Sequence, residues 1–199
     1  MGAELEKSRS EVSTGERVAS RVRGHTMLAF REAARELFGE QGLTRIGSRL
    51  PTSMLTRIDQ RSEWVPAEFV VAWAEAAWDC LLAHDEVALA RYIDRMIDLG
   101  FGRVRRLLLA IATPQGVVRR ATELWRGELT DGRLVSYGTS PTSARMVLHD
   151  HPFLESALLR AIVAEAFRYS LALAGAKDAV AHHEGELGGP LVVSLSWSG

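Results

Sequence analysis

The chain has 199 residues, of which 47% are hydrophobic and 25% are charged. This composition is ordinary for a globular protein and excludes a disordered chain. A net charge of -1 and an isoelectric point near 6.6 give no reason to expect nucleic acid or an anionic membrane surface as the main partner. The length predicts one domain over residues 17–199, preceded by a polar, Ser-rich flexible leader over residues 1–16.

The chain carries a single cysteine, Cys80, which excludes an internal disulfide framework and favours a reducing compartment. No apolar run reaches the length of a membrane span, and the first 17 residues lack the apolar core of a signal peptide. We therefore expect a cytoplasmic protein without membrane insertion. No basic side chain or helix N-terminus is evident near Cys80, so we interpret it as a small buried hydrophobe.

The N-terminal half is dominated by helical patterns. Alternation over residues 18–22 predicts an edge strand that Gly24 ends. The clearest helix begins at Pro66, because its polar positions form only a narrow stripe and the remainder is apolar. The other expected helices cover residues 27–38, which Gly39 and Gly42 would end, and residues 43–50, 53–59, 86–99, 101–112 and 115–129.

The C-terminal half changes to strand patterns after the Asp131-Gly132 turn signal. Alternating runs over residues 133–139 and 144–150 predict a β-hairpin. Pro152 is expected to open a long apolar helix to about residue 174, followed by strands over residues 179–183 and 191–197. This order predicts an α+β fold, in which an N-terminal helical layer packs with a small C-terminal antiparallel sheet and one long helix.

The sequence contains no nucleophile elbow, phosphate loop, dinucleotide fingerprint or zinc-protease motif. His149 and His151 have a spacing that can bind metal if the strand continues. Pro152 follows at once, so we favour a strand-end turn with solvated histidines. His182 and His183 would point to opposite faces of a strand, so one of them at most could join the first pair. We therefore assign no metal site, no cofactor and no catalytic residue.

Two groups of residues could nevertheless form binding sites. The most basic stretch could hold an acidic protein partner or a phosphate, although we favour solvated faces of two amphipathic helices as its explanation. Its arginines are Arg103, Arg105, Arg106, Arg119 and Arg120. The aromatic residues could line a pocket for a small apolar ligand, although such residues more often fill a core. The candidate pocket residues are Phe69, Trp73, Trp78, Trp125 and Phe167.

The order of these features resembles a known family. The features are the strand before Arg23-Gly24, Trp64-Val65-Pro66 before a buried helix, the 99–102 helix corner, Leu124-Trp125 before a hairpin, and Ser196-Trp197 in the last strand. They resemble the uncharacterised myxobacterial paralogous family over roughly residues 18–197. That family is similar to the superfamily containing 4-vinyl reductase domains, haem nitric-oxide/oxygen-binding domains and trafficking-complex subunits.

The resemblance implies an α+β domain that dimerises readily and often encloses an apolar pocket, with no enzyme chemistry. Residues 185–190 lack the cysteines that 4-vinyl reductase domains carry near their last hairpin, which disfavours a cysteine-based metal site. The Tyr-x-Ser-x-Arg signature of the haem-binding relatives is absent, and the candidate axial ligand His84 falls at an expected helix end, so haem is disfavoured. We expect a non-catalytic sensory or adaptor domain acting through protein contacts as a homodimer. The alternative is a sensor module that binds a small apolar ligand in an internal pocket.

Overall fold

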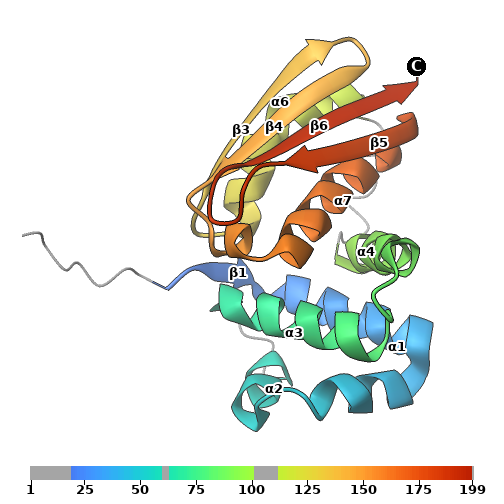
Figure 1. Cartoon of the computed structure of the whole chain (residues 1–199), viewed down its shortest axis with the longest axis vertical. Coiled ribbons are helices and arrows are strands. Elements are labelled where there is room, and N and C mark those ends of the chain that lie inside the picture. Colours follow the sequence, from blue (N-terminus) through green and yellow to red (C-terminus); the bar gives the residue numbers. More distant parts are fainter. Residues whose placement is uncertain (1–18, 60–62, 101–111, 199) are drawn as a thin grey trace, which may run out of the picture.

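The computed structural model describes residues 19–59, 63–100 and 112–198. It confirms the α+β class, with a helical half below and a sheet half above in Figure 1. Helices α6 and α7 lie on one face of the sheet, and α4 lies between α7 and the helices α1 and α3. The predicted helix over residues 101–112 lies outside the described residues except for its last position, and so do Arg103, Arg105 and Arg106.

The helical half starts with a short two-stranded ribbon. Strand β1 (Arg21–Arg23) pairs antiparallel with β2 (Trp64–Pro66), and Val22 between them is buried. The ribbon confirms the predicted edge strand. The helices of the helical half are α1 (Gly24–Gly47), α2 (Thr52–Asp59), α3 (Ala67–Cys80) and α4 (Glu86–Gly100).

Helix α1 is interrupted at Gly39, whose φ of 69° and ψ of -174° are not helical. This residue divides the predicted helix over residues 27–38 from the helical turns that follow. Glycine tolerates a positive φ at no steric cost, so the chain can change direction here. Gly42 was expected to act as a second stop, and this expectation was wrong, because Gly42 is a buried residue inside the continuing helix.

The sheet half contains four antiparallel strands in the order β3-β4-β6-β5. The strands are β3 (Arg133–Ser140), β4 (Ser143–His149), β5 (Lys177–Glu184) and β6 (Leu191–Ser198). Alternation places Ala144, Met146 and Leu148 of β4 on the buried face, which matches the predicted hairpin. One face of this sheet therefore covers the core and the other faces outward.

Helix α6 (Pro114–Glu128) is held to strand β3 by side chains of both elements. The Thr122 hydroxyl donates to the Leu134 carbonyl at 3.0 Å, and the Ser136 hydroxyl donates to the Val118 carbonyl at 2.7 Å. Thr113 caps the helix by accepting from the Gly116 amide. These bonds fix the rotation of α6 and so determine which of its side chains face the interior.

Helix α7 (Ala157–Leu173) starts later than the sequence predicts. Pro152 instead opens the 3-10 turn η1 (Pro152–Glu155), and Ser156 then caps α7 by accepting from the Leu159 amide. Pro152 was predicted to open the helix because the first turn of a helix tolerates proline. The stronger N-cap preference of serine sets the observed start.

The two halves are joined through α4 and α7. Arg168 of α7 donates to both carboxylate oxygens of Asp94 on α4, at 2.9 and 3.0 Å, and also pairs with Glu165. The Tyr169 hydroxyl donates to Asp98 at 2.9 Å. None of the described helices is long and apolar enough to cross a membrane.

A buried hydrogen-bond chain ties the helices of the helical half to one another. The indole of Trp73 on α3 donates to the Tyr92 hydroxyl on α4 at 2.9 Å, and that hydroxyl donates to the Phe30 carbonyl on α1 at 2.8 Å. Burial raises the pKa of Tyr92. The phenol therefore stays protonated and keeps donating to α1.

Candidate functional site

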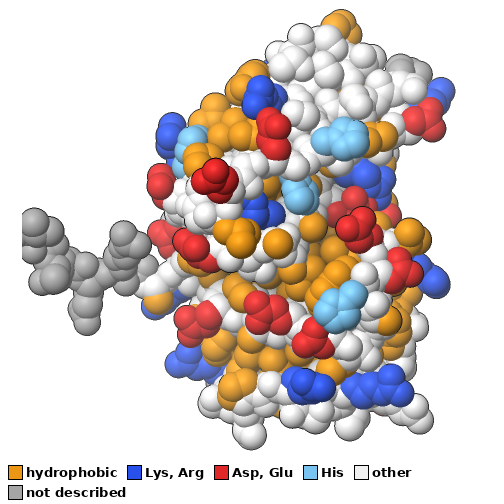
Figure 2. Space-filling model, viewed as in Figure 1, with side chains coloured by type: hydrophobic (Ala, Val, Ile, Leu, Met, Phe, Trp, Pro, Cys, Tyr) orange, Lys and Arg blue, Asp and Glu red, His pale blue; other side chains and the backbone are white. Residues whose placement is uncertain are grey.

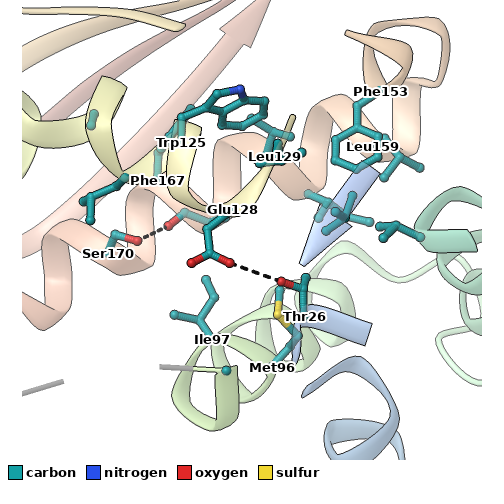
Figure 3. A pocket seen from close by; sticks show the side chains of 18 of the residues that line it. Thr26, Met96, Ile97, Trp125, Glu128, Leu129, Phe153, Leu159, Phe167 and Ser170 are labelled. Carbon is teal, nitrogen blue, oxygen red and sulfur yellow. Dashed lines mark hydrogen bonds between the residues drawn. The ribbon is translucent and has the colours of Figure 1, made fainter. Parts of the chain in front are cut away.

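A cavity of about 200 Å³ lies where the two halves meet. Its walls come from α1 and α4 of the helical half and from α6 and α7 of the sheet half. Figure 3 shows the side chains of these elements converging on one space, with Trp125 and Phe167 on one side and Met96 and Ile97 on the other. In Figure 2, hydrophobic side chains are visible between the acidic ones on the face shown.

The described lining of the cavity is apolar apart from four polar residues. Aliphatic and aromatic side chains from every wall face the space, and many of them belong to the hydrophobic core. Such a lining attracts apolar molecules because it offers dispersion contacts and little competition from water. The main apolar contributors are Phe30, Met96, Ile97, Val117, Ala121, Trp125, Phe153, Ile162, Val163, Ala166 and Phe167.

Three of the polar residues form a cluster that bridges the two halves. Nε2 of His25 lies 2.9 Å from Oε2 of Glu128, and the Thr26 hydroxyl donates to the same oxygen at 3.5 Å. His25 and Thr26 come from the first turn of α1, whereas Glu128 ends α6. Figure 3 shows the Glu128 carboxylate directed toward Thr26, near Met96 and Ile97.

The structure brings two of the five predicted pocket residues to this cavity. Trp125 and Phe167 both line it, with their ring centroids 6.5 Å apart. Phe69, Trp73 and Trp78 are not among the described lining residues. Trp73 is instead a core residue bonded to Tyr92, and Trp78 packs edge-on against His84 in the turn after α3. The predicted binding of a ligand by these five side chains stays a prediction.

The polar cluster was not predicted from the sequence, although a signal was present. Val117, Ala121, Trp125 and Glu128 recur at helical spacing and share one face of α6. A carboxylate at the end of an otherwise apolar stripe could have indicated a polar group aimed at the interior. Its partner could not be identified, because Thr26 lies 102 residues away along the chain.

His151 corrects the expectation of solvated histidines. Its side chain is only 4% exposed and packs edge-on against Trp125 and Phe153. Burial lowers the pKa of this imidazole to about 4, against the smaller opposing effect of Asp131. His151 is therefore neutral at physiological pH and is part of the packing.

His151 and Ser20 face each other at a second hollow, which is larger than the cavity and partly polar. The two side chains are not arranged for base catalysis. Nδ1 of His151 accepts from the Phe153 amide, so the proton of the neutral ring resides on Nε2. That nitrogen lies 3.5 Å from the Ser20 hydroxyl and would donate to it. An imidazole that already holds its proton toward the serine cannot take the proton of the hydroxyl.

The remaining histidines do not assemble into a metal centre. Within the described ranges, no group of three or more His, Cys, Asp or Glu side chains could hold a metal ion. His182 and His183 point to opposite faces of β5, as expected, with His182 opposite Ser194 on the outward face. Burial and the nearby Arg160 lower the pKa of His183.

The two described arginines of the basic stretch, Arg119 and Arg120, are exposed on α6. They lie away from the cavity, which α6 faces with its apolar stripe. Cys80 is half-buried at the end of α3, and His84 is exposed in the following turn, paired with Asp79 at 3.3 Å. None of these side chains is among the described lining residues of the cavity.

Solved structures with the same arrangement are haem nitric-oxide/oxygen-binding (H-NOX) proteins. The Fe(II) unliganded H-NOX protein from K. algicida has a TM-score of 0.63 and 10% identity, covering 89% of this chain and 97% of that chain. The chain has the H-NOX fold. An oxygen-binding H-NOX domain related to soluble guanylate cyclases has a TM-score of 0.59 and 11% identity, covering 89% and 95%. At these identities the likeness shows the fold, and no protein-family model or curated protein matches the sequence.

Haem is named in the description of one solved neighbour of TM-score 0.58. Haem needs an axial His, Cys, Met or Tyr, and the described lining offers His25 and two methionines. The cavity is too small for haem. Its volume of about 200 Å³ is close to the roughly 150 Å³ of a cavity that holds one benzene molecule, and a porphyrin contains four pyrrole rings. The described lining also offers no Lys or Arg for the haem propionates. These residues therefore do not fit haem.

Proposed function

We propose that this chain is a sensor module that binds a small apolar molecule in the cavity between its two halves. The observation that carries this proposal is the apolar space bounded by α1, α4, α6 and α7. The H-NOX fold supports it, since the solved neighbours include a domain described as oxygen-binding. We place the chain in the myxobacterial paralogous family on the sequence features that it shares with that family.

The position of the cavity suits a sensor because both halves contribute walls. A guest that contacts α1 and α4 on one side and α6 and α7 on the other stabilises one relative placement of the halves. A ligand shifts a conformational equilibrium only through such differential contacts. The signal would then reach a protein partner or a second copy of the chain, for which exposed Arg119 and Arg120 offer positive charge.

A cavity-filling substitution tests the proposal. Ala166 of α7 lines the cavity, so Ala166→Leu would place three further carbon atoms in the space that the guest needs. Indene, a neutral two-ring hydrocarbon, serves as the probe. We expect indene to raise the melting temperature of the wild-type protein and to have at most a tenth of its wild-type affinity for Ala166→Leu, measured by calorimetry.

Ala172→Leu is the matched control. Ala172 lies on the same helix, is half-buried and is not among the described lining residues. Indene should bind this variant with wild-type affinity. The proposal is wrong if indene does not bind the wild-type protein, or if both variants lose the same fraction of affinity.

A further inference from the structure

We propose that Asp94 of α4 and Glu165 of α7 hold one proton between them, and that this proton makes the contact between α4 and α7 stronger at mildly acidic pH than at neutral pH. The two helices meet where the halves of the molecule join (Figure 1). The proton therefore acts on the contact that holds the halves together. The proposal concerns this junction and does not depend on a guest in the cavity.

The first observation is that one guanidinium serves two carboxyl groups. Nη2 of Arg168 lies 2.9 and 3.0 Å from the two carboxylate oxygens of Asp94, and the same nitrogen lies 2.6 Å from Oε1 of Glu165. Nε of Arg168 donates to that oxygen of Glu165 at 2.7 Å. Because both carboxyl groups contact one nitrogen atom, they are close neighbours with a single positive charge between them.

The second observation is a hydrogen bond between the carboxyl groups of Asp94 and Glu165. An ionised carboxylate only accepts hydrogen bonds, so this bond requires a proton on one of the two acids. If both acids ionise, the bond is lost and two like charges face each other at short range, which disfavours the second ionisation. The two groups therefore titrate as a pair.

The titration of this pair falls near neutral pH. Burial, the largest cause, raises the pKa of Asp94 to about 6, and Glu165 raises it further against the attraction of Arg168. The hydrogen bond with Glu165 raises the pKa of Arg168, so the guanidinium keeps its charge. Burial and the bond to Asp98 raise the pKa of Tyr169 to about 12, so its hydroxyl keeps donating.

The other described charges around this contact belong to α4 and α1. Arg95 of α4 pairs with Glu36 of α1 and lies 3.8 Å from Oδ2 of Asp98. Arg91, one turn before Asp94 on α4, is exposed. Arginine does not lose its proton in proteins, so these two cations are constant between pH 5 and 7.5. We therefore assign the change of charge at the contact in this range to the Asp94–Glu165 pair.

The direction of the effect follows from proton linkage. The pKa of Asp94 is raised from 3.8 to about 6 in the folded chain, so folding binds the proton more tightly. The stabilisation is fully present below about pH 3.8 and is lost as the pH rises through 6. Between pH 5 and 7.5 this group should lower the folding equilibrium constant by a factor of about ten.

The experiment uses Asp94→Asn, which imitates the protonated form at every pH. Urea unfolding at pH 5 and 7.5 gives the factor by which this substitution changes the folding equilibrium constant. We expect that factor to be about tenfold larger at pH 7.5 than at pH 5, because only the wild-type chain loses its proton in between. A merely structural role of Asp94 would give the same factor at both pH values and would overturn the proposal.

Glu165→Gln then tests the partner. In a Glu165→Gln background the like charge is absent, so the tenfold difference for Asp94→Asn should shrink to threefold or less. In a Glu86→Gln background it should stay tenfold, because Glu86 is an exposed acid at the start of the same helix α4. A difference that stays tenfold with Glu165→Gln would show that Asp94 titrates without Glu165, and the shared proton would be wrong.

Carboxyl ¹³C NMR of the wild-type protein checks the pair without relying on the stability of a variant. We expect the side-chain carboxyl signals of Asp94 and Glu165 to shift with one common midpoint near pH 6. Separate midpoints, or an Asp94 midpoint near 4, would overturn the proposal.

Discussion

At the residue scale, burial shifts the pKa values of His151 and Asp94, in each case in the direction that favours the neutral form. The neutral imidazole of His151 packs between Trp125 and Phe153. Burial also raises the pKa of Asp94 to about 6, an effect larger than the opposing attraction of Arg168. Because the two groups carry opposite charges when ionised, their effects on the free energy of unfolding have opposite slopes with pH.

His151 should make the protein more stable as the pH rises from about 4 to about 6.5. In this range the unfolded chain binds a proton at this residue, and the folded chain with its pKa of about 4 does not. The shift corresponds to about 3 kcal/mol across the range. We expect His151→Asn to remove most of this slope in urea unfolding measured at pH 4.5, 5.5 and 7.

His182→Asn is the control for this prediction, since His182 is exposed on β5. It should leave the slope unchanged. Equal slopes for the wild-type protein and His151→Asn would show that His151 is not kept neutral by its surroundings.

Asp94 should act in the opposite direction. With a folded pKa of about 6, its proton is bound more tightly in the folded chain, so its stabilising contribution is present below about pH 3.8 and is lost as the pH rises through 6. Removing this group with Asp94→Asn should therefore steepen the rise of stability with pH between 4 and 6. A shallower rise in the same urea series would contradict the assignment.

At the element scale, Arg160 connects α7 to the loop between β5 and β6. Arg160 is 3% exposed, and its guanidinium donates to the carbonyls of Glu184, Gly189 and Pro190 at 3.0 to 3.1 Å and to the carbonyl of Leu154 at 3.4 Å. Gly185 adopts a φ of 113°, and a Cβ there would lie 2.6 Å from this guanidinium. The loop is thus shaped around the arginine.

Arg160→Met should cost about 2 to 4 kcal/mol of unfolding free energy, because buried carbonyls lose their donor. Amide hydrogen exchange should accelerate in residues 185–190 more than in β4. Arg145→Met is the comparison, since Arg145 is a partly exposed residue that pairs with Glu184 at 3.1 Å, and such a surface pair contributes little. A loss below 1 kcal/mol for Arg160→Met would contradict the role assigned to it.

The elements themselves could be predicted well where local chemistry decides. Alternation in β4 and β6 and the polar stripe of α3 are local patterns, and each led to the observed element. The start of α7 was misplaced because Pro152 and Ser156 are both good first-turn signals and the sequence does not rank them. The polar cluster at the cavity could not be predicted, because His25 and Glu128 meet only through the tertiary packing that brings the start of α1 to the end of α6.

At the scale of the whole molecule, the cavity and the α4–α7 contact occupy the same junction. Met96 and Ile97 line the cavity, and Asp94 and Asp98 on the same helix bind α7. A guest and these polar contacts therefore act on the same two halves of the molecule. We expect the protein to unfold in one transition whose midpoint rises with guest concentration, as linkage requires.

The irregular edges of the sheet bear on how this protein behaves at high concentration. Register shifts occur in both edge strands, between Gly138 and Ser140 in β3 and between Lys177 and Val180 in β5. Bulges at an edge twist the backbone away from the flat geometry that recruits another strand. Pairing of one sheet with that of a second molecule is thus discouraged at both ends, which protects the protein from fibrous aggregation and leaves self-association to surfaces other than the strand edges.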